Sequence, residues 1–568
     1  EANLLLTGRL RLFGTLHDVR RAQDEGDALR LDWNFHPAET PFEPFRKDPK
    51  FPWEVARLAA LPRLGLAYFI SGRGRYARAA ASIVEDWSVT QPVGQGLHFA
   101  SALEVGIRLI AMMQAFHFFR RSEAFQAQTL ATLVRRIARE AAWLQGHRSV
   151  ERLVAGNHLV GELAGLVVTD LTFPELGQGN RLEDNLARFA RAIDEQVAPD
   201  GTSLEQSATY GRFVADFVAA VLATAAAAGH PVPAGLVDRA AALAGWLGAL
   251  TTPDGQLPLM GDNDGGRGVD WAETVPSSDA RGVIMALAAL TGRPEPLLAL
   301  GRPGAPVATH GYGPDGAELT WWYAGPDGLA RLTALRQNMP PPRALRHFPD
   351  GGWAVATGSA PDHLVVRCGP FGHGLPKPSG HSHADWMAPV LTLDGTPLLV
   401  DPGNFGYTTV GEARQAFRSE EAHAVLSFEG APMAVPGTTF RWDDIPAPAR
   451  LVAAQPDSDS IELAGSWRTT GGSRSVAARR VIVYNCSRSR VDIRDDWSAG
   501  GDPPAAVVQR WPLAAGSEVT AGAGGTGFEV RTDGGAVFLF SIEPAASIEV
   551  ERRPLAPQYA AQRPAIRV

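Results

Sequence analysis

Cysteine is scarce in this chain of 568 residues, which contains only Cys368 and Cys486. The two stand alone, without a CxxC pair or a dense spacing, so neither a disulfide framework nor a thiolate metal site is expected. Long apolar runs are missing as well. Because no stretch reaches the roughly 18 consecutive apolar residues that a membrane-spanning helix needs, the sequence predicts no membrane span.

Concentrated positive charge is also absent. The formal net charge is −8 and no stretch gathers Lys and Arg, which argues against nucleic acid as a partner. An anionic polymer would need a local basic cleft that works against the overall charge. The chain starts at Glu1 rather than Met, which hints that an export leader is removed.

What the chain does contain is a helical pattern over its first half. Segments rich in Ala, Leu and Arg repeat with helical periodicity and end near Gly, Ser or Pro. Short connections join them and no fixed-length repeat is visible, so the pattern favours an α/α toroid over a solenoid. The predicted helices are 53–70, 76–87, 100–119, 124–144, 158–171, 182–197, 204–228, 236–250 and 278–290.

The pattern changes in the second half. Two turn-rich segments, 301–316 and 338–352, are followed by short alternating runs bounded by Gly, Asp-Gly or Asn, which is typical of an antiparallel sandwich. A chain of this length is too long for one core. The predicted fold class is therefore α+β multidomain, with an incomplete α/α toroid in residues 1–335 and an antiparallel β-sandwich in residues 336–568.

The stretch from Gly380 to Tyr407 holds the densest group of reactive side chains. His381 and His383 are two residues apart, so on a strand both imidazoles share one face, which suits a metal or a proton-transfer site. Half-exposed strand histidines without a function explain the spacing equally well. The prolines at 376 and 378 indicate a loop that enters a strand, and this favours function.

A metal site is the second prediction for this stretch. Asp401 ends an apolar run, where a buried carboxylate is costly unless it is paired or liganded, although it could also cap a turn. With His383 and His423 it gives a His-Asp-His set, whose N and O donors suit zinc. A simple Asp-Gly hairpin would put Asp401 on the opposite face from His383. The shared metal therefore requires a bulge, for which Pro389 is the obvious cause.

The helical half offers polar residues at two helix starts. Asn157 and His158 precede Glu162 by about one turn, and an N-cap is a common role for such an Asn. Tyr210 falls on an apolar helical stripe and could be core. Its hydroxyl would still need a partner if it is buried.

The residues alone also leave two alternatives to a metal or proton-transfer enzyme open: a glycoside hydrolase and a carbohydrate-binding protein. The loop 259–268 lacks the EF-hand pattern and is predicted to line a cleft with Asp262, Asp264 and Arg267. A toroidal glycoside hydrolase would need two carboxylates that face each other; Glu162, Glu205 and Asp262 are available, without a recognisable pairing. A non-catalytic carbohydrate-binding protein is the third possibility.

Five blocks carry a family resemblance. They are GLHFASALEVGIRLI (96–110), GNHLVGELAGL (156–166), DGTSLEQSATY (200–210), GHSHADWM (380–387) with LLVDPGNFGY (398–407), and FRSEEAHAVLSFEG (417–430). In this order they resemble the heparinase II/III-type polysaccharide lyases. The architecture of that family is an α/α toroid followed by an antiparallel β-sandwich, in agreement with the pattern above.

The resemblance implies β-elimination on a uronate-containing polysaccharide, which leaves a 4,5-unsaturated uronate end. By motif position, Asn157 resembles the residue that contacts the uronate carboxylate. Tyr210 resembles the tyrosine acid, which for one stereochemistry is also the base, and His381 resembles the base or its assistant at the opposite face. His383, Asp401 and His423 match the ligands of a structural divalent metal, expected to be Zn²⁺. Substrate contacts are expected from His158, Glu205, Arg267, Trp386, Tyr407 and Arg418.

The resemblance leaves the polymer open. It implies an anionic polysaccharide or oligosaccharide: a glycosaminoglycan such as heparin or heparan sulfate, or alginate or a bacterial exopolysaccharide. The acidic net charge of the chain favours a less charged polymer over a highly sulfated one. Such a lyase is expected to be periplasmic or secreted in a bacterium, and the sequence carries no signal for an oligomeric state.

Overall fold

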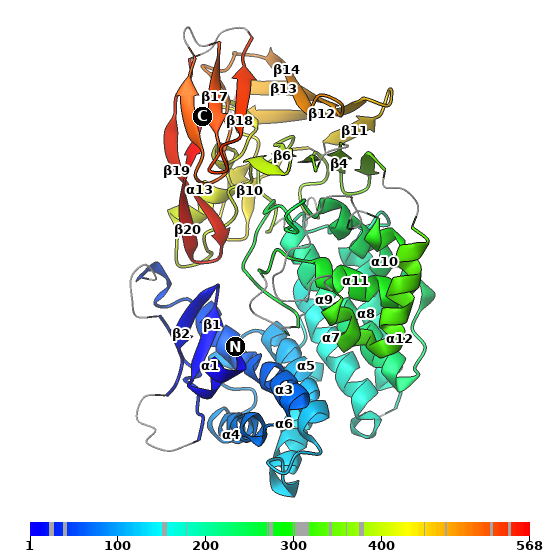
Figure 1. Ribbon diagram of the computed structural model, residues 1–568. Coiled ribbons are helices and arrows are strands. Elements are labelled where there is room, and N and C mark those ends of the chain that lie inside the picture. Colours follow the sequence, from blue (N-terminus) through cyan, green and yellow to red (C-terminus); the bar gives the residue numbers. More distant parts are fainter. Residues whose placement is uncertain are drawn as a thin grey trace.

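The computed structural model places helices in the N-terminal half and antiparallel sheets in the C-terminal half (Figure 1). It describes residues 1–21, 28–37, 43–149, 156–177, 179–269, 271, 276–298, 300, 317–339, 343–358, 361–373, 380–447, 449–471, 474–522, 526–543 and 547–568. The turn-rich segment 301–316 and the prolines at 376 and 378 lie outside the described residues.

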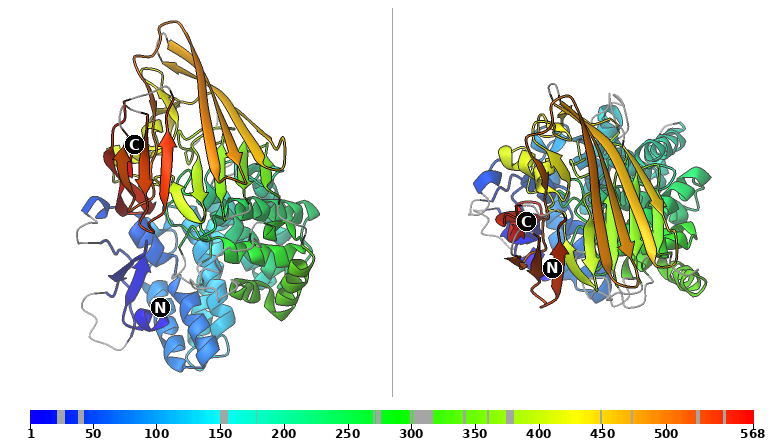
Figure 2. Two further views of the ribbon diagram at one scale, coloured as in Figure 1. Left: turned by 45° about the horizontal axis from the view of Figure 1, so that its top comes forward. Right: turned by 90° about the horizontal axis from the view of Figure 1, so that it is seen from above.

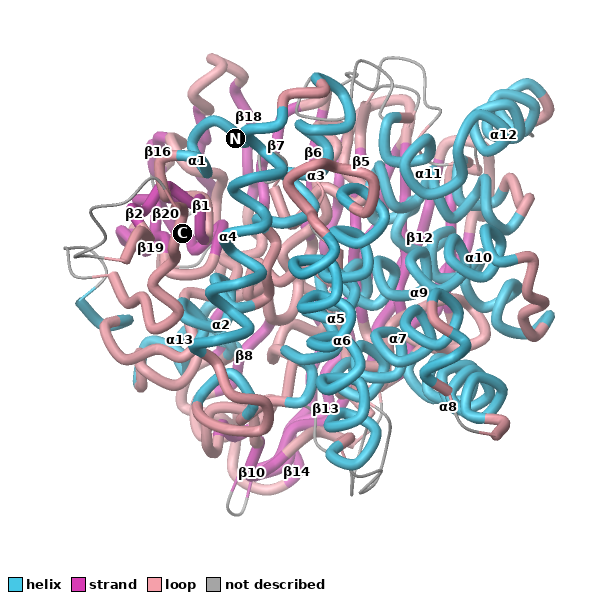
Figure 3. Tube along the Cα trace, turned by 90° about the horizontal axis from the view of Figure 1, so that it is seen from below, coloured by secondary structure: helices cyan, strands magenta, loops and turns pink. Residues whose placement is uncertain are grey.

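The long helices form two layers along an arc (Figure 3). Successive odd-numbered helices contact one another, and the even-numbered helices pack outside them. This arrangement is the predicted incomplete α/α toroid. The inner layer is α3 (Ala60–Ser71), α5 (Ala102–Phe119), α7 (Asn157–Thr172), α9 (Ala208–Ala228) and α11 (Arg281–Thr291); the outer layer is α4 (Gly74–Thr90), α6 (Ala127–His147), α8 (Arg181–Gln196), α10 (Ala234–Leu250) and α12 (Glu318–Gln337).

Glycines let α5 and α7 pack backbone against backbone. A Cβ on Gly165 would lie 2.6 Å from the carbonyl oxygen of Gly106, and a Cβ on Gly106 would lie 2.5 Å from the carbonyl oxygen of Gly161. No side chain fits at such distances. The small residues of α5 and α7 therefore serve close packing of the inner layer.

Two inner helices, α5 and α9, are long and apolar enough to cross a membrane by length and composition. In the structure, 72% of the apolar window of each is buried inside the protein. Their apolar character is accounted for by the helical core, where inner helices are covered on nearly all sides.

The C-terminal half is built on two main sheets. One has five strands in the order β3-β4-β5-β6-β7, and the other has four in the order β11-β12-β13-β14. The strands of the first are β3 (Leu345–Phe348), β4 (Trp353–Thr357), β5 (His363–Arg367), β6 (Val390–Leu393) and β7 (Thr396–Leu399); those of the second are β11 (Arg450–Ala454), β12 (Ser460–Gly471), β13 (Arg474–Asn485) and β14 (Arg490–Gly500).

Shorter helices and strands make up the N-terminal segment and the rest of the C-terminal half. The N-terminal segment holds α1 (Ala2–Leu6), β1 (Arg9–Leu12), β2 (Thr15–Asp18) and α2 (Lys50–Ala56). The C-terminal half adds α13 (Glu412–Arg418), β8 (Leu426–Phe428), β9 (Val435–Pro436), β10 (Trp442–Asp444), β15 (Val507–Gln509), β16 (Glu518–Ala521), β17 (Gly527–Arg531), β18 (Val537–Ser541), β19 (Glu551–Gln558) and β20 (Ala561–Arg567).

The five-stranded sheet is a middle layer, so its central strands are buried on both faces. Along β4, Trp353 and Val355 join the helical core, whereas Ala354 and Ala356 join the core shared with the long strands β12 and β13. This alternation is what a strand with two covered faces requires. The long strands lie over the outer face of the sheet (Figure 2), which makes the predicted sandwich.

The helical layer and the sheet are joined by specific contacts. The Trp353 ring lies 5.4 Å from that of Trp246 on α10, and its indole N–H donates to Gln206 at 2.9 Å. His363 on β5 contacts the carbonyl oxygen of Ala249 at 2.9 Å. Residues from both halves are therefore held in a fixed relation.

Three local predictions are corrected. The helix predicted over 204–228 begins at Ala208, because the Ser207 side chain caps it. Helix α12 was not predicted, and it is kinked at Gly325, just before Pro326. Residues 380–389 form a loop rather than the entry of a strand.

The irregular hairpin that a shared metal required is present. The pairing of β6 with β7 shifts its register between Leu391 and Thr392. The shift lies just after Pro389, the residue predicted to cause it. Asp401 follows this bulge, so its side chain need not point to the face opposite His383, as it would in a regular hairpin.

Candidate active site

Two histidines of the loop 380–389 share one carboxylate. His381 Nδ1 lies 2.9 Å from Asp262 Oδ2, and His383 Nε2 lies 2.9 Å from Asp262 Oδ1. Arg414 on α13 forms a bidentate ion pair with the same carboxylate, with Nη2 2.7 Å from Oδ2. Asp262 is fully buried, where an unpaired charge would be very costly. The two imidazoles thus converge on a residue of the helical half, and not by sharing a strand face.

Tyr210 reaches the same place from the first turn of α9. Its backbone N–H donates to the Ser207 hydroxyl at 3.2 Å, the N-cap bond that fixes the helix start. The Tyr210 ring stacks on the His381 ring with centroids 3.8 Å apart, and its hydroxyl lies 2.9 Å from the Tyr407 hydroxyl. Three groups that can carry a proton are therefore in contact, and we call Tyr210, Tyr407 and His381 the reaction centre.

Asn157 is held by a carboxylate at the start of α7. Its side-chain Nδ2 lies 2.9 and 3.0 Å from the two oxygens of Glu205, and its backbone N–H donates to Glu205 at 3.1 Å. Glu205 therefore satisfies a free N–H of the helix end, and Asn157 is not itself the cap. His158 beside it is exposed.

Burial and charge set the protonation states at the reaction centre. Burial raises the pKa of Tyr210 well above its ordinary value, and the carboxylates of Asp264 and Asp262 raise it further. Burial alone would lower the pKa of His381, but its hydrogen bond to Asp262 and the charge of Glu205 raise that pKa overall. Tyr210 is thus a protonated phenol, and His381 is a stronger base than a free imidazole.

The predicted metal group is buried and compact. His383, Asp401 and His423 offer ligand atoms that all lie within 4.8 Å of one another. His383 Nε2 is hydrogen-bonded to Asp262, and His423 Nδ1 lies 3.1 Å from Asp401 Oδ2. The remaining nitrogens, His383 Nδ1 and His423 Nε2, are buried without a hydrogen-bond partner among the described residues. Two orphaned imidazole nitrogens beside a carboxylate fit a metal ion, so the group could hold one.

The protonation of His383 agrees with that use. Burial lowers the pKa of His383, which keeps the imidazole neutral, as a metal ligand must be. Its N–H faces Asp262, and a carboxylate on the far nitrogen is the usual way to orient a ligating histidine. Asp262 therefore connects the metal group to His381.

Two of the predicted substrate contacts are fully buried. Trp386 is fully buried in the sandwich core. Arg418 is also fully buried, and its guanidinium donates to backbone carbonyls in 438–441 at 2.7 to 3.3 Å. Both side chains support the loops around the site and lie away from any surface that a polysaccharide could touch.

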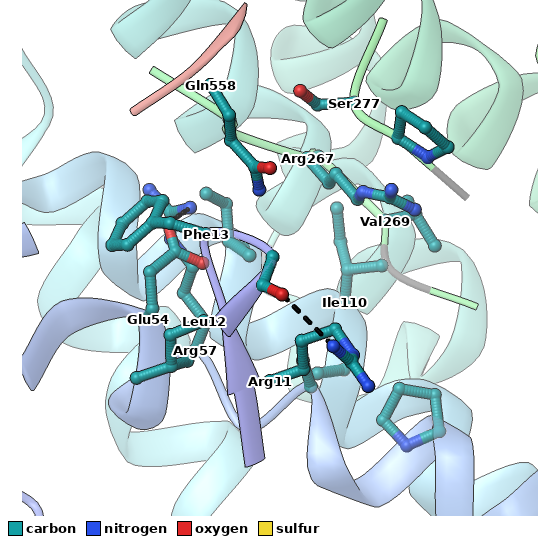
Figure 4. Close-up of a pocket in the computed structure, with 18 of the residues that line it drawn as sticks. Arg11, Leu12, Phe13, Glu54, Arg57, Ile110, Arg267, Val269, Ser277 and Gln558 are labelled. Carbon is teal, nitrogen blue, oxygen red and sulfur yellow. Dashed lines mark hydrogen bonds and ion pairs between the residues drawn. The ribbon is translucent and has the colours of Figure 1, made fainter. Parts of the chain in front are cut away.

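Arg267 lies in a separate cavity of about 360 Å³ (Figure 4). Arg11, Phe13 and Gln558 also line this cavity, together with apolar residues of α5. Tyr210 and His381 are not among its described lining residues. The structure therefore brings Arg267 close to the N-terminal hairpin and not to the reaction centre.

Arg414 was missed by reasoning from the sequence. It lies 152 positions from Asp262 along the chain, and nothing in its local spacing announces a partner. Asp262 was predicted to line a cleft and was considered as a hydrolase carboxylate, although it binds both histidines. A buried acid that follows the apolar Leu-Met pair at 259–260 was the one available signal.

The carboxylates considered for a hydrolase have other partners. Glu162 is buried, and the backbone N–H and hydroxyl of Ser149 both donate to it at 2.6 Å. Glu205 is bonded to Asn157. Arg414 and the two histidines hold the pKa of Asp262 well below its usual range despite burial, so it cannot act as a general acid. The three do not form the acid–base pair of a glycoside hydrolase.

Family models match both halves of the chain. The model described as Heparinase II/III N-terminus matches residues 19–275, and the model described as Heparinase II/III-like, C-terminal matches residues 340–568. A curated relative, the heparin-sulfate lyase of Pedobacter heparinus, is 24% identical over 224 residues, which are 38% of this chain. The match spans 33% of the length of that relative.

Solved structures match over the whole fold. A crystal structure of heparinase III gives a TM-score of 0.67 at 14% identity, covering 97% of this chain and 78% of the other. A heparan sulfate lyase from Pedobacter heparinus gives a TM-score of 0.59 at 17% identity, covering 100% of this chain and 78% of the other. At these identities the likeness establishes the fold.

Proposed function

The chain belongs to the heparinase II/III family of polysaccharide lyases, and from this premise we propose that it cleaves a uronate-containing polysaccharide by β-elimination. The observation that carries the proposal is the Tyr210–Tyr407 hydroxyl pair beside the stacked His381. Elimination needs a base for the proton at C5 of the uronate and an acid for the oxygen that leaves C4. The reaction centre offers both within direct contact.

His381 is the proposed base. Its Nδ1 faces Asp262, which leaves Nε2 as the free acceptor and holds the ring in one orientation. The bond from C5 to hydrogen breaks, the proton goes to Nε2, and the electron pair forms the C4–C5 double bond. The hydrogen bond to Asp262 stabilises the imidazolium that results.

Tyr210 is the proposed acid. Its raised pKa keeps the phenol protonated, so it can donate its proton to the glycosidic oxygen as the bond from C4 breaks. The Tyr407 hydroxyl, 2.9 Å away, can replace that proton. For the opposite uronate stereochemistry, Tyr210 would act as the base and His381 as the acid. Tyr210 would then need to lose its proton first.

Asn157 and His158 are proposed to bind the uronate carboxylate. Neutralising that group stabilises the negative charge that develops as C5 loses its proton. Glu205 holds the Asn157 amide in place, which makes it a positioning residue. An incoming carboxylate would share the amide with Glu205, while the exposed His158 can donate a hydrogen bond of its own.

His383, Asp401 and His423 are proposed to hold a zinc ion. When bound, the ion would supply a fixed anchor for the loop 380–389 and not Lewis acidity, because the group lies on the opposite side of Asp262 from His381. The Asp262 carboxylate hydrogen-bonds both His383 and His381, so fixing His383 also fixes the orientation of His381.

The substrate class follows from charge. The net charge is −8, and the reaction centre is surrounded by the acids Glu205, Asp262 and Asp264. We propose a uronate polymer that is less charged than highly sulfated heparin, such as alginate or a bacterial exopolysaccharide. Polysaccharides do not diffuse across membranes. We therefore also propose that the enzyme acts in the periplasm or outside the cell.

A panel of uronate polymers tests the proposal. Growth of ultraviolet absorbance from the unsaturated end is expected with at least one polymer that is unsulfated or weakly sulfated. New reducing ends without that absorbance would assign a hydrolase, and neither signal with any polymer would assign a carbohydrate-binding protein. Either of the last two results overturns the proposal.

A further inference from the structure

The two ends of the described chain meet beside the reaction centre. In Figure 1 the β19–β20 hairpin points toward the β1–β2 hairpin. The side chains that meet are all buried, and we call them the closing cluster: Phe13, Phe45, Asp48, Lys50 and Tyr559.

The closing cluster is tied together by several kinds of contact. The Tyr559 hydroxyl donates to Asp48 at 2.7 Å, and the Tyr559 ring lies 4.9 Å from Phe13 and 5.6 Å from Phe45. Lys50 pairs with Asp264 at 2.6 Å and lies 5.7 Å from the centre of the Tyr559 ring. Packing and a charged hydrogen bond thus hold the two chain ends together, and the ion pair joins the N-terminal segment to the loop 259–268.

The cluster packs directly against the segment that carries Tyr407. The rings of Tyr407 and Tyr559 lie 5.5 Å apart, and Ala560 N–H donates to the Phe405 carbonyl at 2.9 Å. The other side of Tyr407 bonds to Tyr210. Side chains in van der Waals contact leave no room for a pyranose ring between Tyr407 and the cluster.

The cavity of Figure 4 does not continue the reaction centre past this point. Phe13 and Gln558 form part of its lining, and Gln558 is the neighbour of Tyr559. The closing cluster therefore borders this cavity, and Tyr407, Tyr210 and His381 are not among its described lining residues. Among the described residues, the side chains that reach solvent around the reaction centre include His381, which is 16% exposed, and the exposed His158 and Phe440, whose ring lies 4.9 Å from that of Tyr407.

We propose that the closing cluster makes the lyase act from a chain end. The inference rests on the proposed function, and adds how the polymer is cut. A chain that continued on both sides of the broken bond would have to pass through the cluster. A terminal unit meets no such obstacle, so each event releases a short product of uniform length.

The product pattern of the wild-type protein is the primary test. The polymer that gives the strongest absorbance in the panel is digested, and viscosity and product sizes are followed from the first time points. Absorbance should rise while viscosity stays nearly constant, with one short product from the start. A ladder of intermediate sizes with an early fall of viscosity overturns the end-acting mode while leaving the lyase activity established. Absence of unsaturated product with every polymer overturns the proposed function itself, and the inference with it.

Variants of the cluster give an independent test. Tyr559→Ala removes the ring that contacts Tyr407 and the bond to Asp48, so products of intermediate length should appear. Arg563→Ala, on the exposed part of the same hairpin, is the matched control and should keep the wild-type product. Phe13→Ala replaces Tyr559→Ala if a thermal melt shows that the first variant does not fold. Folded cluster variants that release only the wild-type product contradict the role of the cluster.

Discussion

At the scale of single residues, Asp262 organises the site. One buried carboxylate accepts from His381, His383 and Arg414, so the proposed base and a proposed metal ligand are positioned by the same group. Sequence reasoning identified both histidines from their spacing. It could not identify their shared partner, because a contact across more than 100 positions leaves no local pattern.

Tyr210 gives the sharpest residue-scale prediction. Tyr210→Phe should lower kcat by roughly 10²- to 10⁴-fold, the usual contribution of a general acid, while substrate binding changes little because only one hydroxyl is removed. Steady-state rates and equilibrium binding to the polymer measure the two effects. Tyr68→Phe, on α3 and away from the site, should keep wild-type rates. Near-full activity of Tyr210→Phe would remove it from the mechanism.

Glu162 predicts a pH dependence of stability. Burial raises its pKa from 4.5 to about 6, so the folded state binds a proton more tightly than the unfolded state. The stabilisation is complete below pH 4.5 and is lost as pH rises through about 6; a shift of this size corresponds to about 2 kcal/mol.

The comparison with Glu162→Gln isolates this effect. The wild type minus variant difference in free energy of unfolding should fall by about 2 kcal/mol between pH 4 and pH 7. Denaturant titrations at several pH values measure it. A difference that does not change with pH would show that the carboxyl does not titrate in this range.

At the scale of elements, helical periodicity was a better guide than strand alternation. The inner helices were predicted because their apolar pattern is long. The kinked α12 was not, since Gly325 and Pro326 interrupt its pattern. The segment 380–389 was predicted to be a loop entering a strand, with His381 and His383 on one strand face, yet its course is set by Asp262 in the other half.

The close approach of α5 and α7 can be tested with two glycines. Gly165→Ala places a Cβ 2.6 Å from the Gly106 carbonyl oxygen, and because the obstacle is backbone it should cost about 1–3 kcal/mol. Gly146→Ala on α6 meets nothing within 4 Å and should stabilise by about 0.5–1 kcal/mol through its better helix propensity. Thermal or denaturant unfolding compares them. Equal effects of the two substitutions would contradict the packing described.

At the scale of the whole molecule, the reaction centre belongs to neither half alone. Tyr210 comes from the toroid, whereas His381 and Tyr407 come from the C-terminal half. The order of helices and strands predicted these halves. Their relative placement depends on contacts such as Trp353 with Gln206, which no periodicity encodes.

The metal group predicts a loss of both stability and activity on chelation. Removing a bound ion should lower the free energy of unfolding by about 3 kcal/mol, the linkage expected for an ion at 100 times its Kd. Elemental analysis should find one ion per chain, absent in His383→Ala and retained in the surface variant His117→Ala. A chain that binds no ion, or melts identically with and without chelator, contradicts the assignment.

Elimination at the reaction centre differs from hydrolysis in that no water enters the products, so incorporation of solvent oxygen distinguishes the two. The best polymer is cleaved in water enriched with heavy oxygen, and the short product is weighed by mass spectrometry. Elimination predicts a product that lacks the mass of one water relative to a hydrolytic fragment and carries no heavy oxygen when it is analysed before its reducing end exchanges oxygen with the solvent. Hydrolysis would instead add one water for each bond cleaved, so one heavy oxygen at one of the two new ends, with no missing water, would contradict elimination.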